Sequence, residues 1–343
     1  MAKQKVVVTG GAGYIGSHTV VALHAAGFSP VIFDNFSNSK PEVLDGIARI
    51  IGEKPQLFEV DCRSKAKLTH AIETCASDGQ IAGVIHFAAF KAVGESTEKP
   101  LDYFDNNIGS TVSLLEAMTA AGVSNLVFSS SCTVYGQPDA IPVDEHAPIL
   151  PAESPYGYTK QACERLITDA FNSSMPLSAC LLRYFNPIGA HPSAEIGELP
   201  LGHPNNLVPF ITQATAGTRG PLTVFGNDYP TEDGTCIRDY IHVMDLARAH
   251  VASIHWLQSN PASCEAFNLG TGKGKSVSEV IAAFEKANGI AVPYAFGARR
   301  AGDVTAIFAN AEKAKRALGW KCELTLEEAL RDAWKWQQKL TAG

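Results

Sequence analysis

The chain has 343 residues, which is long enough for one large α/β unit or for two domains of about 150 residues each. Hydrophobic residues make up 45% of the chain and charged residues 18%, a composition that excludes long disordered segments and predicts a packed globular protein. The net charge of −7 rules out a generally basic surface for nucleic acid or an anionic membrane, so a small-molecule ligand is expected.

The chain begins with MAKQKVVVTGGAGYIG, which lacks the apolar segment and small-residue cleavage site of a secretory leader. No later stretch reaches the roughly 18 apolar residues of a membrane span, so we expect a cytoplasmic protein with no membrane partner. The eight cysteines are scattered and form no C-x-x-C pair. They are expected to be free thiols, with neither a metal site nor a disulfide framework.

Short β-branched runs alternate with longer amphipathic stretches up to about residue 185. The pattern predicts strands at residues 5–10, 30–34, 56–60, 83–90, 125–131 and 179–185. Helical patterns at residues 14–27 and 64–79 each end at a glycine suited to a helix C-terminus. This alternation is typical of βαβ units, so residues 1–185 are predicted to form an α/β, Rossmann-type doubly wound parallel sheet with helices on both faces.

The next segment, residues 186–206, reads NPIGAHPSAEIGELPLGHPNN and breaks this rhythm. So long an irregular segment is uncommon in a compact domain without a functional reason, and we interpret it as a wall of a ligand site. Further strands are predicted at residues 222–226 and 264–272, and further helices at residues 276–288 and 325–340. We therefore predict a smaller mixed α/β lobe over residues 186–343, with a soft boundary across which the two lobes can exchange elements.

A glycine-rich turn follows the first predicted strand and opens the first helix. Gly10, Gly13 and Gly16 allow a tight turn, close approach of a pyrophosphate and close packing of helix on strand. Asp34 ends the next strand, 18 residues past Gly16, where a carboxylate can accept both hydroxyls of an adenosine ribose and repels a 2′-phosphate. The pattern favours NAD over NADP. Asp61, at the end of the third strand, is either an adenine contact or a solvated acid.

Tyr156 and Lys160 are four residues apart and share a face of one predicted helix, roughly 6 Å apart at Cβ. An ammonium held about 5 Å from the phenol oxygen is worth about 3 kcal/mol at an effective dielectric of about 20, so the pKa of Tyr156 is expected to fall by roughly two units. A tyrosine tuned in this way can accept a hydroxyl proton while hydride leaves the same carbon. Serines in LVFSSSCTVYG lie at the carboxyl edge of a parallel strand, where one can bind the same hydroxyl.

Longer stretches extend these motifs over essentially the whole chain: GGAGYIGSHT, DNFSNSK, HFAAFKAVGES, DNN, SSSCTVYG, SPYGYTK, LLRYFNPIGAHPS, PNNLVP, VFGNDYPTEDGT, RDYIHVMDLA and RRAGD. The sequence resembles the extended short-chain dehydrogenase/reductase superfamily, with its Ser…Tyr-x-x-x-Lys set, and within it the UDP-glucose 4-epimerase family. The resemblance implies a tightly held NAD that oxidises C4 of the sugar and returns the hydride to the opposite face of a rotated 4-keto intermediate. It also implies UDP-galactose and UDP-glucose as substrates in galactose metabolism, and a homodimer built from helices that flank the sheet.

The resemblance further implies roles for individual residues. Ser131 and Tyr156 would be catalytic, while Lys160 would tune the tyrosine and contact the nicotinamide ribose. The residues implied to line NAD are Gly10, Gly13, Tyr14, Ile15, Gly16, Asp34, Asn35, Asp61, Phe87, Ala88, Lys91, Asn106, Lys160 and Phe185. Those implied to bind the nucleotide sugar are Ser131, Tyr156, Asn186, Asn206, Leu207, Phe225, Arg238, Arg300, Asp303 and Ile307. The two arginines of this set offer planar forks suited to a diphosphate, and its aspartate suits ribose hydroxyls.

A few positions depart from the family pattern. Val60 and Ala89 replace glycines, and Tyr158 stands where lysine is common, but none of these changes removes a group that the chemistry needs. Ile307 bears on substrate choice, because members with a tyrosine there tend to refuse N-acetylated sugars and members with a small residue admit them. Isoleucine is intermediate in volume, so UDP-N-acetylhexosamines and UDP-pentoses stay open as alternative substrates.

Two other classes of protein compete with this interpretation. A nucleotide-sugar 4,6-dehydratase needs an Asp-Glu acid/base pair after the serine-type residue, whereas this chain has Cys132-Thr133-Val134 and lacks those proton carriers. An inactive NAD-binding scaffold or redox sensor would keep the glycine turn without needing the tyrosine and lysine. The chain retains both side chains, and we therefore expect an enzyme.

Overall fold

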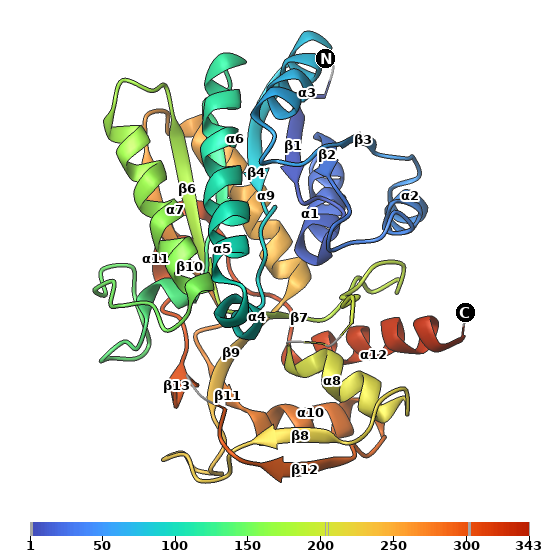
Figure 1. Ribbon diagram of the computed structural model, residues 1–343. Helices are drawn as coiled ribbons and strands as arrows, with labels where there is room; N and C mark the ends of the chain where they lie inside the picture. The colour runs from blue at the N-terminus through green and yellow to red at the C-terminus, as the bar shows by residue number, and fades with distance from the viewer. Residues whose placement is uncertain (1–2, 203, 205, 301–302, 343) are drawn as a thin grey trace.

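The computed structural model describes residues 3–202, 204, 206–300 and 303–342 (Figure 1). A seven-stranded sheet with the order β10-β6-β5-β4-β1-β2-β3 forms the centre of the larger lobe. Its strands are β1 (Lys5–Thr9), β2 (Ser29–Asp34), β3 (Gln56–Glu59), β4 (Ile81–His86), β5 (Asn125–Ser129), β6 (Ser178–Tyr184) and β10 (Cys264–Leu269). Every neighbouring pair is parallel, which confirms the predicted doubly wound sheet.

Helices cover both faces of this sheet, because its strands are apolar on both sides. One face carries α1 (Tyr14–Ala25), α2 (Val43–Ile51), α9 (Val243–Ser259) and α11 (Glu312–Leu318). The other face carries α3 (Lys65–Ser77), α6 (Gly109–Ala120) and α7 (Pro155–Asn172). Strand β1 shows the alternation: Val6 and Val8 pack into the core under α1 and α9, and Val7 packs into the core under α3 and α6.

Four short helical segments lie in the connections of the larger lobe. They are α4 (Val93–Glu98), α5 (Pro100–Tyr103), the π-helix η1 (Phe104–Ile108) and the 3-10 helix η2 (Cys132–Tyr135). The first three lead from the carboxyl end of β4 into α6, and η2 follows directly after β5. All four therefore lie near the edge of the sheet where parallel strands end and ligands bind.

The smaller lobe lies beyond that carboxyl edge (Figure 1). Strands β7 (Asn186–Ile188), β9 (Ile237–His242), β11 (Gly274–Ser276) and β13 (Ala306–Ile307) form one small sheet, and β8 (Leu222–Phe225) pairs with β12 (Tyr294–Gly297). Helices α8 (Leu207–Thr215), α10 (Val277–Asn288) and α12 (Leu326–Ala342) contribute to a separate apolar core with them. The predicted strand 222–226 and helices 276–288 and 325–340 are present in this lobe, whereas the strand predicted at residues 264–272 is β10 of the large sheet.

The chain returns to the larger lobe after entering the smaller one. Helix α9 packs against α1, and β10 pairs with β6 to extend the seven-stranded sheet. In the middle of the sheet, the predicted strand 83–90 is β4, which ends at His86, and Phe87 N then donates one more backbone hydrogen bond to Thr9 O at 3.0 Å. In the part of the chain that the structure describes, no helix is long and apolar enough to cross a membrane.

Candidate active site

The glycine-rich turn between β1 and α1 leaves no room for a side chain at Gly10 or Gly16. Gly10 has a φ of +68°, and its carbonyl oxygen accepts a hydrogen bond from Gly13 N at 3.0 Å. A Cβ atom at Gly16 would lie 2.2 Å from that oxygen, so only glycine lets the helix begin this close to the strand. The first turn of α1 has no side-chain cap, and its backbone N–H groups are suited to a diphosphate.

Asp34 ties this turn to the segment that follows β2. Its carboxylate accepts hydrogen bonds from Ala12 N at 2.9 Å, Phe36 N at 2.9 Å and Ser39 Oγ at 3.0 Å. A carboxylate offers about four acceptor positions, so these donors occupy most of its capacity. A ribose hydroxyl would therefore share Asp34 with these local donors or displace one of them. Ser39 Oγ is the only one of the three that belongs to a side chain.

A groove along the carboxyl edge brings together most of the residues implied for NAD. Its lining includes Gly10, Gly13, Asp34, Asn35, Asp61, Phe87, Ala88 and Asn106. The remaining members of the set, Gly16, Lys91, Lys160, Tyr14, Ile15 and Phe185, are not part of this lining. Tyr14 donates its hydroxyl hydrogen to Gly189 O at 2.7 Å, Ile15 packs against the core, and Phe185 is buried in a smaller apolar cluster.

Arg63 is a neighbour of the groove that the sequence analysis missed. Its guanidinium binds Asp61 at 2.8 Å and Asp105 at 2.8 Å, and it keeps the pKa of Asp61 below its ordinary value. Asp61 is therefore held by Arg63 at the edge of the groove. The arginine lies two residues after the aspartate, but its second partner is 42 residues away, and no periodic signal marks that pairing.

Ser131, Tyr156 and Lys160 meet at the carboxyl ends of β5 and β6. Helix α7 begins after Ser154, whose side chain accepts from Gly157 N, with a proline in its first turn. The Lys160 ammonium donates to Ser129 O at 2.7 Å and lies 5.9 Å from the centroid of the Tyr156 ring. Ser131 is the N-cap of η2, where its side chain accepts from Thr133 N at 3.2 Å, and hydrogen bonding by Ser131 lowers the pKa of Tyr156. The sequence analysis correctly placed the tyrosine and lysine on one helix face.

Burial controls the ionisation of this cluster. Tyr156 is 8% exposed, and desolvation raises its pKa above the ordinary value while the hydrogen bond from Ser131 lowers it. Desolvation lowers the pKa of Lys160 to about 8, opposed by the negative charge of Glu164. The expected lowering of the tyrosine pKa is therefore not produced by the protein groups alone. The Lys160 ammonium is directed at Ser129 O, and its attraction for the Tyr156 phenolate is smaller than the desolvation penalty that burial imposes on that phenolate.

A buried polar network behind α7 was also missed by the sequence analysis. Glu164 accepts from Ser130 Oγ at 2.5 Å and forms a two-pronged pair with Arg183, with a shortest distance of 2.6 Å. Arg183 in turn donates to Tyr135 OH at 3.1 Å, which donates to Asn268 Oδ1 at 2.6 Å. The network joins the serine run, α7, β6 and β10, and so fixes the elements that carry the cluster.

The charged residues implied for the nucleotide sugar gather in the smaller lobe. Arg300 binds Asp303 at 2.8 Å, and Arg238, on β9, lies 3.4 Å from the same carboxylate. The Arg300 guanidinium also lies 5.8 Å from the ring centroid of Phe225, whose side chain is 43% exposed at the end of β8. Two guanidinium groups, one carboxylate and one exposed ring thus converge, a set suited to a nucleoside diphosphate.

The other implied sugar contacts lie on β7, β13 and the start of α8. Asn186 begins β7, Asn206 is the N-cap of α8 and Leu207 is its first residue. Ile307 is 5% exposed and pairs with Arg238 across β13 and β9. It packs in one apolar cluster with Val134, Tyr135 and Phe185, which places it near the serine end of the site.

The fold and site define a class before any relative is considered. The carboxyl edge of a Rossmann-type sheet holds a glycine turn shaped for a diphosphate and a buried Ser-Tyr-Lys cluster able to handle a hydroxyl proton. This is the arrangement of the extended short-chain dehydrogenase/reductases. Within the described residues, no group of three or more His, Cys, Asp or Glu side chains is placed to hold a metal ion.

Comparison with known proteins makes the assignment more specific. A family model described as GDP-mannose 4,6 dehydratase matches residues 7–333. UDP-glucose 4-epimerase 2 of Arabidopsis thaliana is 51% identical over 339 residues, which cover 98% of this chain and 95% of the relative. The crystal structure of UDP-glucose-4-epimerase from Stenotrophomonas maltophila, with bound NAD and formylated UDP-arabinopyranose, matches with a TM-score of 0.95 at 48% identity over 99% of both chains. The enzyme from Bifidobacterium longum, in complex with NAD+ and UDP, matches with a TM-score of 0.94 at 43% identity over 99% of this chain and 100% of that one.

The chain belongs to the family that this model describes and, within it, to the UDP-glucose 4-epimerases; it is an epimerase. The dehydratase in the name of the family model does not describe this site. At the two positions after Ser131 the chain carries Cys132 and Thr133, and burial raises the pKa of the Cys132 thiol to about 11. Neither side chain can exchange a proton readily near neutral pH, so elimination of water has no acid/base pair here.

Proposed function

We propose that the protein interconverts UDP-galactose and UDP-glucose by NAD-dependent epimerisation at C4, as a step of galactose metabolism. One observation carries the proposal: Ser131, Tyr156 and Lys160 form a buried cluster at the same sheet edge as the glycine turn. The relatives support it, since the two solved epimerases described above contain NAD with UDP or a UDP-sugar. NAD is the cofactor in this proposal.

The residues lining the groove fit NAD by shape and chemistry. The backbone N–H groups at the start of α1 would bind the diphosphate, and Asp34 would accept an adenosine ribose hydroxyl. Lys160 would contact the nicotinamide ribose through its ammonium. NAD, when bound, would supply hydride transfer from and to C4 of the sugar by way of a 4-keto sugar, and its positive charge would favour the phenolate of Tyr156.

The chain's own residues would manage the proton and hold the substrate. Tyr156 accepts the C4 hydroxyl proton and later gives it back, and Ser131 hydrogen-bonds the same hydroxyl. Arg238 and Arg300 bind the diphosphate, and Asp303 accepts ribose hydroxyls. With the nucleotide held in the smaller lobe, the hexose reaches the catalytic cluster at the edge of the larger one.

The test is proton NMR of the purified protein incubated with UDP-galactose and no added cofactor. Appearance of UDP-glucose is the expected result and establishes an epimerase that carries its own NAD. If UDP-galactose stays unchanged even when NAD is supplied, the proposal fails.

A second candidate concerns the sugar rather than the reaction. The Stenotrophomonas structure contains formylated UDP-arabinopyranose, which favours UDP-pentoses as additional substrates. Ile307 is buried against Tyr135 and Phe185, so its side chain sets part of the volume near the catalytic serine. The same NMR assay with UDP-arabinopyranose and UDP-N-acetylgalactosamine distinguishes these substrates, and an Ile307→Ala variant is expected to favour the N-acetylated sugar.

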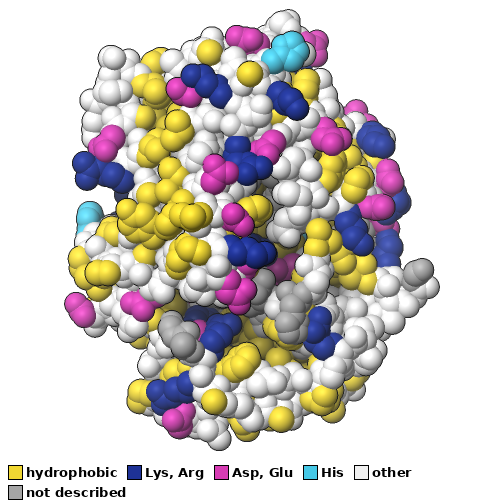
Figure 2. Space-filling view, viewed as in Figure 1, with side chains coloured by type: hydrophobic (Ala, Val, Ile, Leu, Met, Phe, Trp, Pro, Cys, Tyr) yellow, Lys and Arg dark blue, Asp and Glu magenta, His cyan; other side chains and the backbone are white. Residues whose placement is uncertain are grey.

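We also propose that the protein is a cytoplasmic homodimer. All eight cysteines are free, which suits a reducing compartment. Figure 2 shows hydrophobic side chains gathered over the region of α5 and α7, and the exposed apolar residues of these two helices include Leu101, 76% exposed, and Tyr158, 54% exposed. Sedimentation equilibrium tests the dimer, and Leu101→Glu combined with Tyr158→Glu is expected to produce a monomer.

A further inference from the structure

The irregular segment that joins the lobes is anchored at several points, which gives it a defined conformation. Its Glu195 carboxylate pairs with Arg49 of α2 and, at 2.6 Å, with Lys339 of α12. Gly189 accepts the Tyr14 hydroxyl hydrogen bond from α1. The segment therefore touches helices of both lobes, and its side chains can be positioned relative to both.

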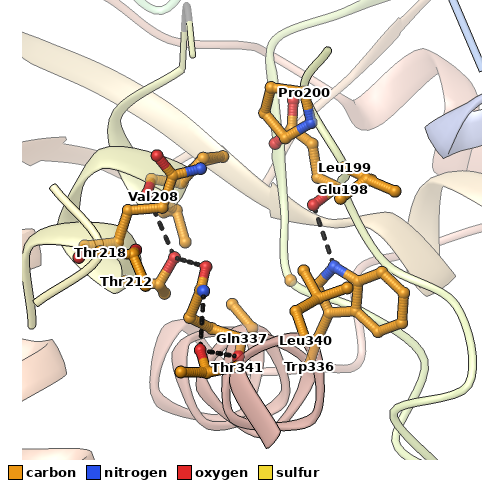
Figure 3. Close-up of a pocket in the computed structure, with 14 residues that line it drawn as sticks. Glu198, Leu199, Pro200, Val208, Thr212, Thr218, Trp336, Gln337, Leu340 and Thr341 are labelled. Atoms are coloured by element: carbon orange, nitrogen blue, oxygen red, sulfur yellow. Dashed lines mark hydrogen bonds between the residues drawn. The ribbon is translucent and has the colours of Figure 1, made fainter. Parts of the chain in front are cut away.

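Glu198 lies at the best-anchored point of this segment. The indole N–H of Trp336, on α12, donates to the carbonyl oxygen of Glu198 at 2.9 Å, as Figure 3 shows. The residue before it is Gly197, where a Cβ atom would lie 2.4 Å from the Trp336 ring. The backbone can approach the indole this closely only because Gly197 has no side chain. The position of Glu198 is thus fixed by its own main chain.

The Glu198 carboxylate contacts Asn206, which is implied to bind the nucleotide sugar, and Lys91, which is implied to line NAD. The same oxygen, Oε1, accepts from Asn206 Nδ2 at 2.6 Å and lies 3.1 Å from Lys91 Nζ. Because a carboxylate can only accept, it fixes which end of the Asn206 amide faces it. The Glu198 side chain is 11% exposed against 44% for Lys91, so the acid is the buried partner of the ion pair. Burial raises the pKa of Tyr14, and the negative charge of Glu198 raises it further.

We propose that Glu198 is a positioning residue. Its carboxylate orients the Asn206 amide toward the UDP-sugar and, through Lys91, aligns that amide with the NAD side of the site. The inference rests on the proposed function, because only the resemblance to the epimerases implies that Asn206 contacts the nucleotide sugar and Lys91 the cofactor. In this proposal Glu198 contacts neither C4 of the sugar nor the C4 hydroxyl group. It acts by holding a donor of the smaller lobe and a cation of the larger lobe on one carboxylate oxygen.

The test compares Glu198→Gln with Glu195→Gln, a matched variant on the same segment that breaks two ion pairs but contacts neither Lys91 nor Asn206. For Glu198→Gln, the Kd for UDP by calorimetry and the KM for UDP-galactose are expected to rise about 10-fold, because a neutral amide is a weaker acceptor and its N–H groups repel Lys91. The kcat is expected to stay within about 3-fold of wild type, and NAD retention after desalting is expected to persist. For Glu195→Gln, both Kd and KM are expected to match wild type.

A double variant separates positioning from general loosening of the segment. If Glu198 acts through Asn206, adding Glu198→Gln to Asn206→Ala leaves the Kd for UDP where Asn206→Ala alone puts it. Independent, additive effects would overturn the inference, as would an equal rise in Kd for Glu195→Gln or an unchanged Kd for Glu198→Gln. Calorimetry needs no turnover, so a wild type that binds UDP but does not epimerise UDP-galactose refutes the proposed function alone. A wild type that binds no UDP refutes this inference as well.

Discussion

Tyr156 and Lys160 carry ionisable groups in surroundings that disfavour their charged forms. Their side chains are 8% and 4% exposed, and burial moves the pKa of the tyrosine up and that of the lysine down. The periodicity of the chain correctly predicted that the two residues share a helix face. It could not predict how strongly the site is desolvated, because burial depends on β5, β6 and η2 closing around them.

Tyr156→Phe should keep NAD and lose about 100-fold or more in kcat, because phenylalanine fills the same space but cannot accept a proton. The measurement is single-substrate kinetics with UDP-galactose, together with the amount of NAD released on denaturation. Tyr158→Phe is the control, since Tyr158 lies two residues later and is 54% exposed. Equal activity of Tyr156→Phe and Tyr158→Phe would contradict the assignment.

The lowered pKa of Lys160 predicts the pH dependence of turnover. The group is charged below about pH 8 and loses its proton as the pH rises through that value. We expect kcat to fall above about pH 8 in wild type, and a low activity without that alkaline limb in Lys160→Gln. Between about pH 8 and the ordinary value of 10.5, the unfolded chain binds more protons at this residue, so its contribution to the free energy of unfolding rises with pH. A kcat that stays constant to pH 10 would refute the prediction.

Helix α7 shows how one element carries both the chemistry and its support. Its first turns hold Tyr156 and Lys160, and the following turn holds Glu164, which raises the pKa of Lys160 and pairs with Arg183 of β6. The start of α7 follows from the Ser154 cap and the proline after it. The pairing of Glu164 with Arg183 does not follow from these local signals, because Arg183 lies on a strand that only the folded sheet brings beside α7.

Glu164→Gln should reduce the free energy of unfolding by about 3–5 kcal/mol, because it leaves the Arg183 guanidinium buried without its counter-ion. The side chains of both partners are 9% exposed, so water cannot replace the lost contact. Urea unfolding followed by circular dichroism measures the change. Asp169→Asn on the same helix breaks an exposed pair with Arg165 and is expected to cost less than about 0.5 kcal/mol. Similar losses for the two variants would show that the buried pair has no special weight.

The whole molecule consists of two lobes whose chain segments interleave. Residues 1–185 contain six of the seven strands of the large sheet, and α9 and β10 come from later in the chain. Without them, β6 becomes an open edge and the apolar face of α1 loses the helix that covers it. The division at residue 185 separates the part expected to bind NAD from the part expected to bind the UDP-sugar. That it also separates two folding units stays a prediction.

A fragment of residues 1–185 expressed alone should therefore fail to unfold cooperatively and should bind a hydrophobic dye such as ANS. The full chain is expected to show one sharp thermal transition and little dye binding. Circular dichroism melts of both proteins make the comparison. A sharp transition for the fragment, with no dye binding, would show that its core is complete without α9 and β10.

The sequence by itself determined the parallel α/β architecture, the glycine turn, Asp34 at the end of β2 and the pairing of Tyr156 with Lys160 on one helix. These features depend on periodicity, turn chemistry and short spacings, which neighbouring residues encode. Only the tertiary structure decided that Arg63 holds Asp61 and Asp105, that Glu164 meets Arg183, and that burial raises the pKa of Tyr156. It alone placed Glu198 beside Lys91, 107 residues away. The physical reason is that desolvation and long-range ion pairing arise from which surfaces meet when the lobes pack, and no local pattern in the chain records that.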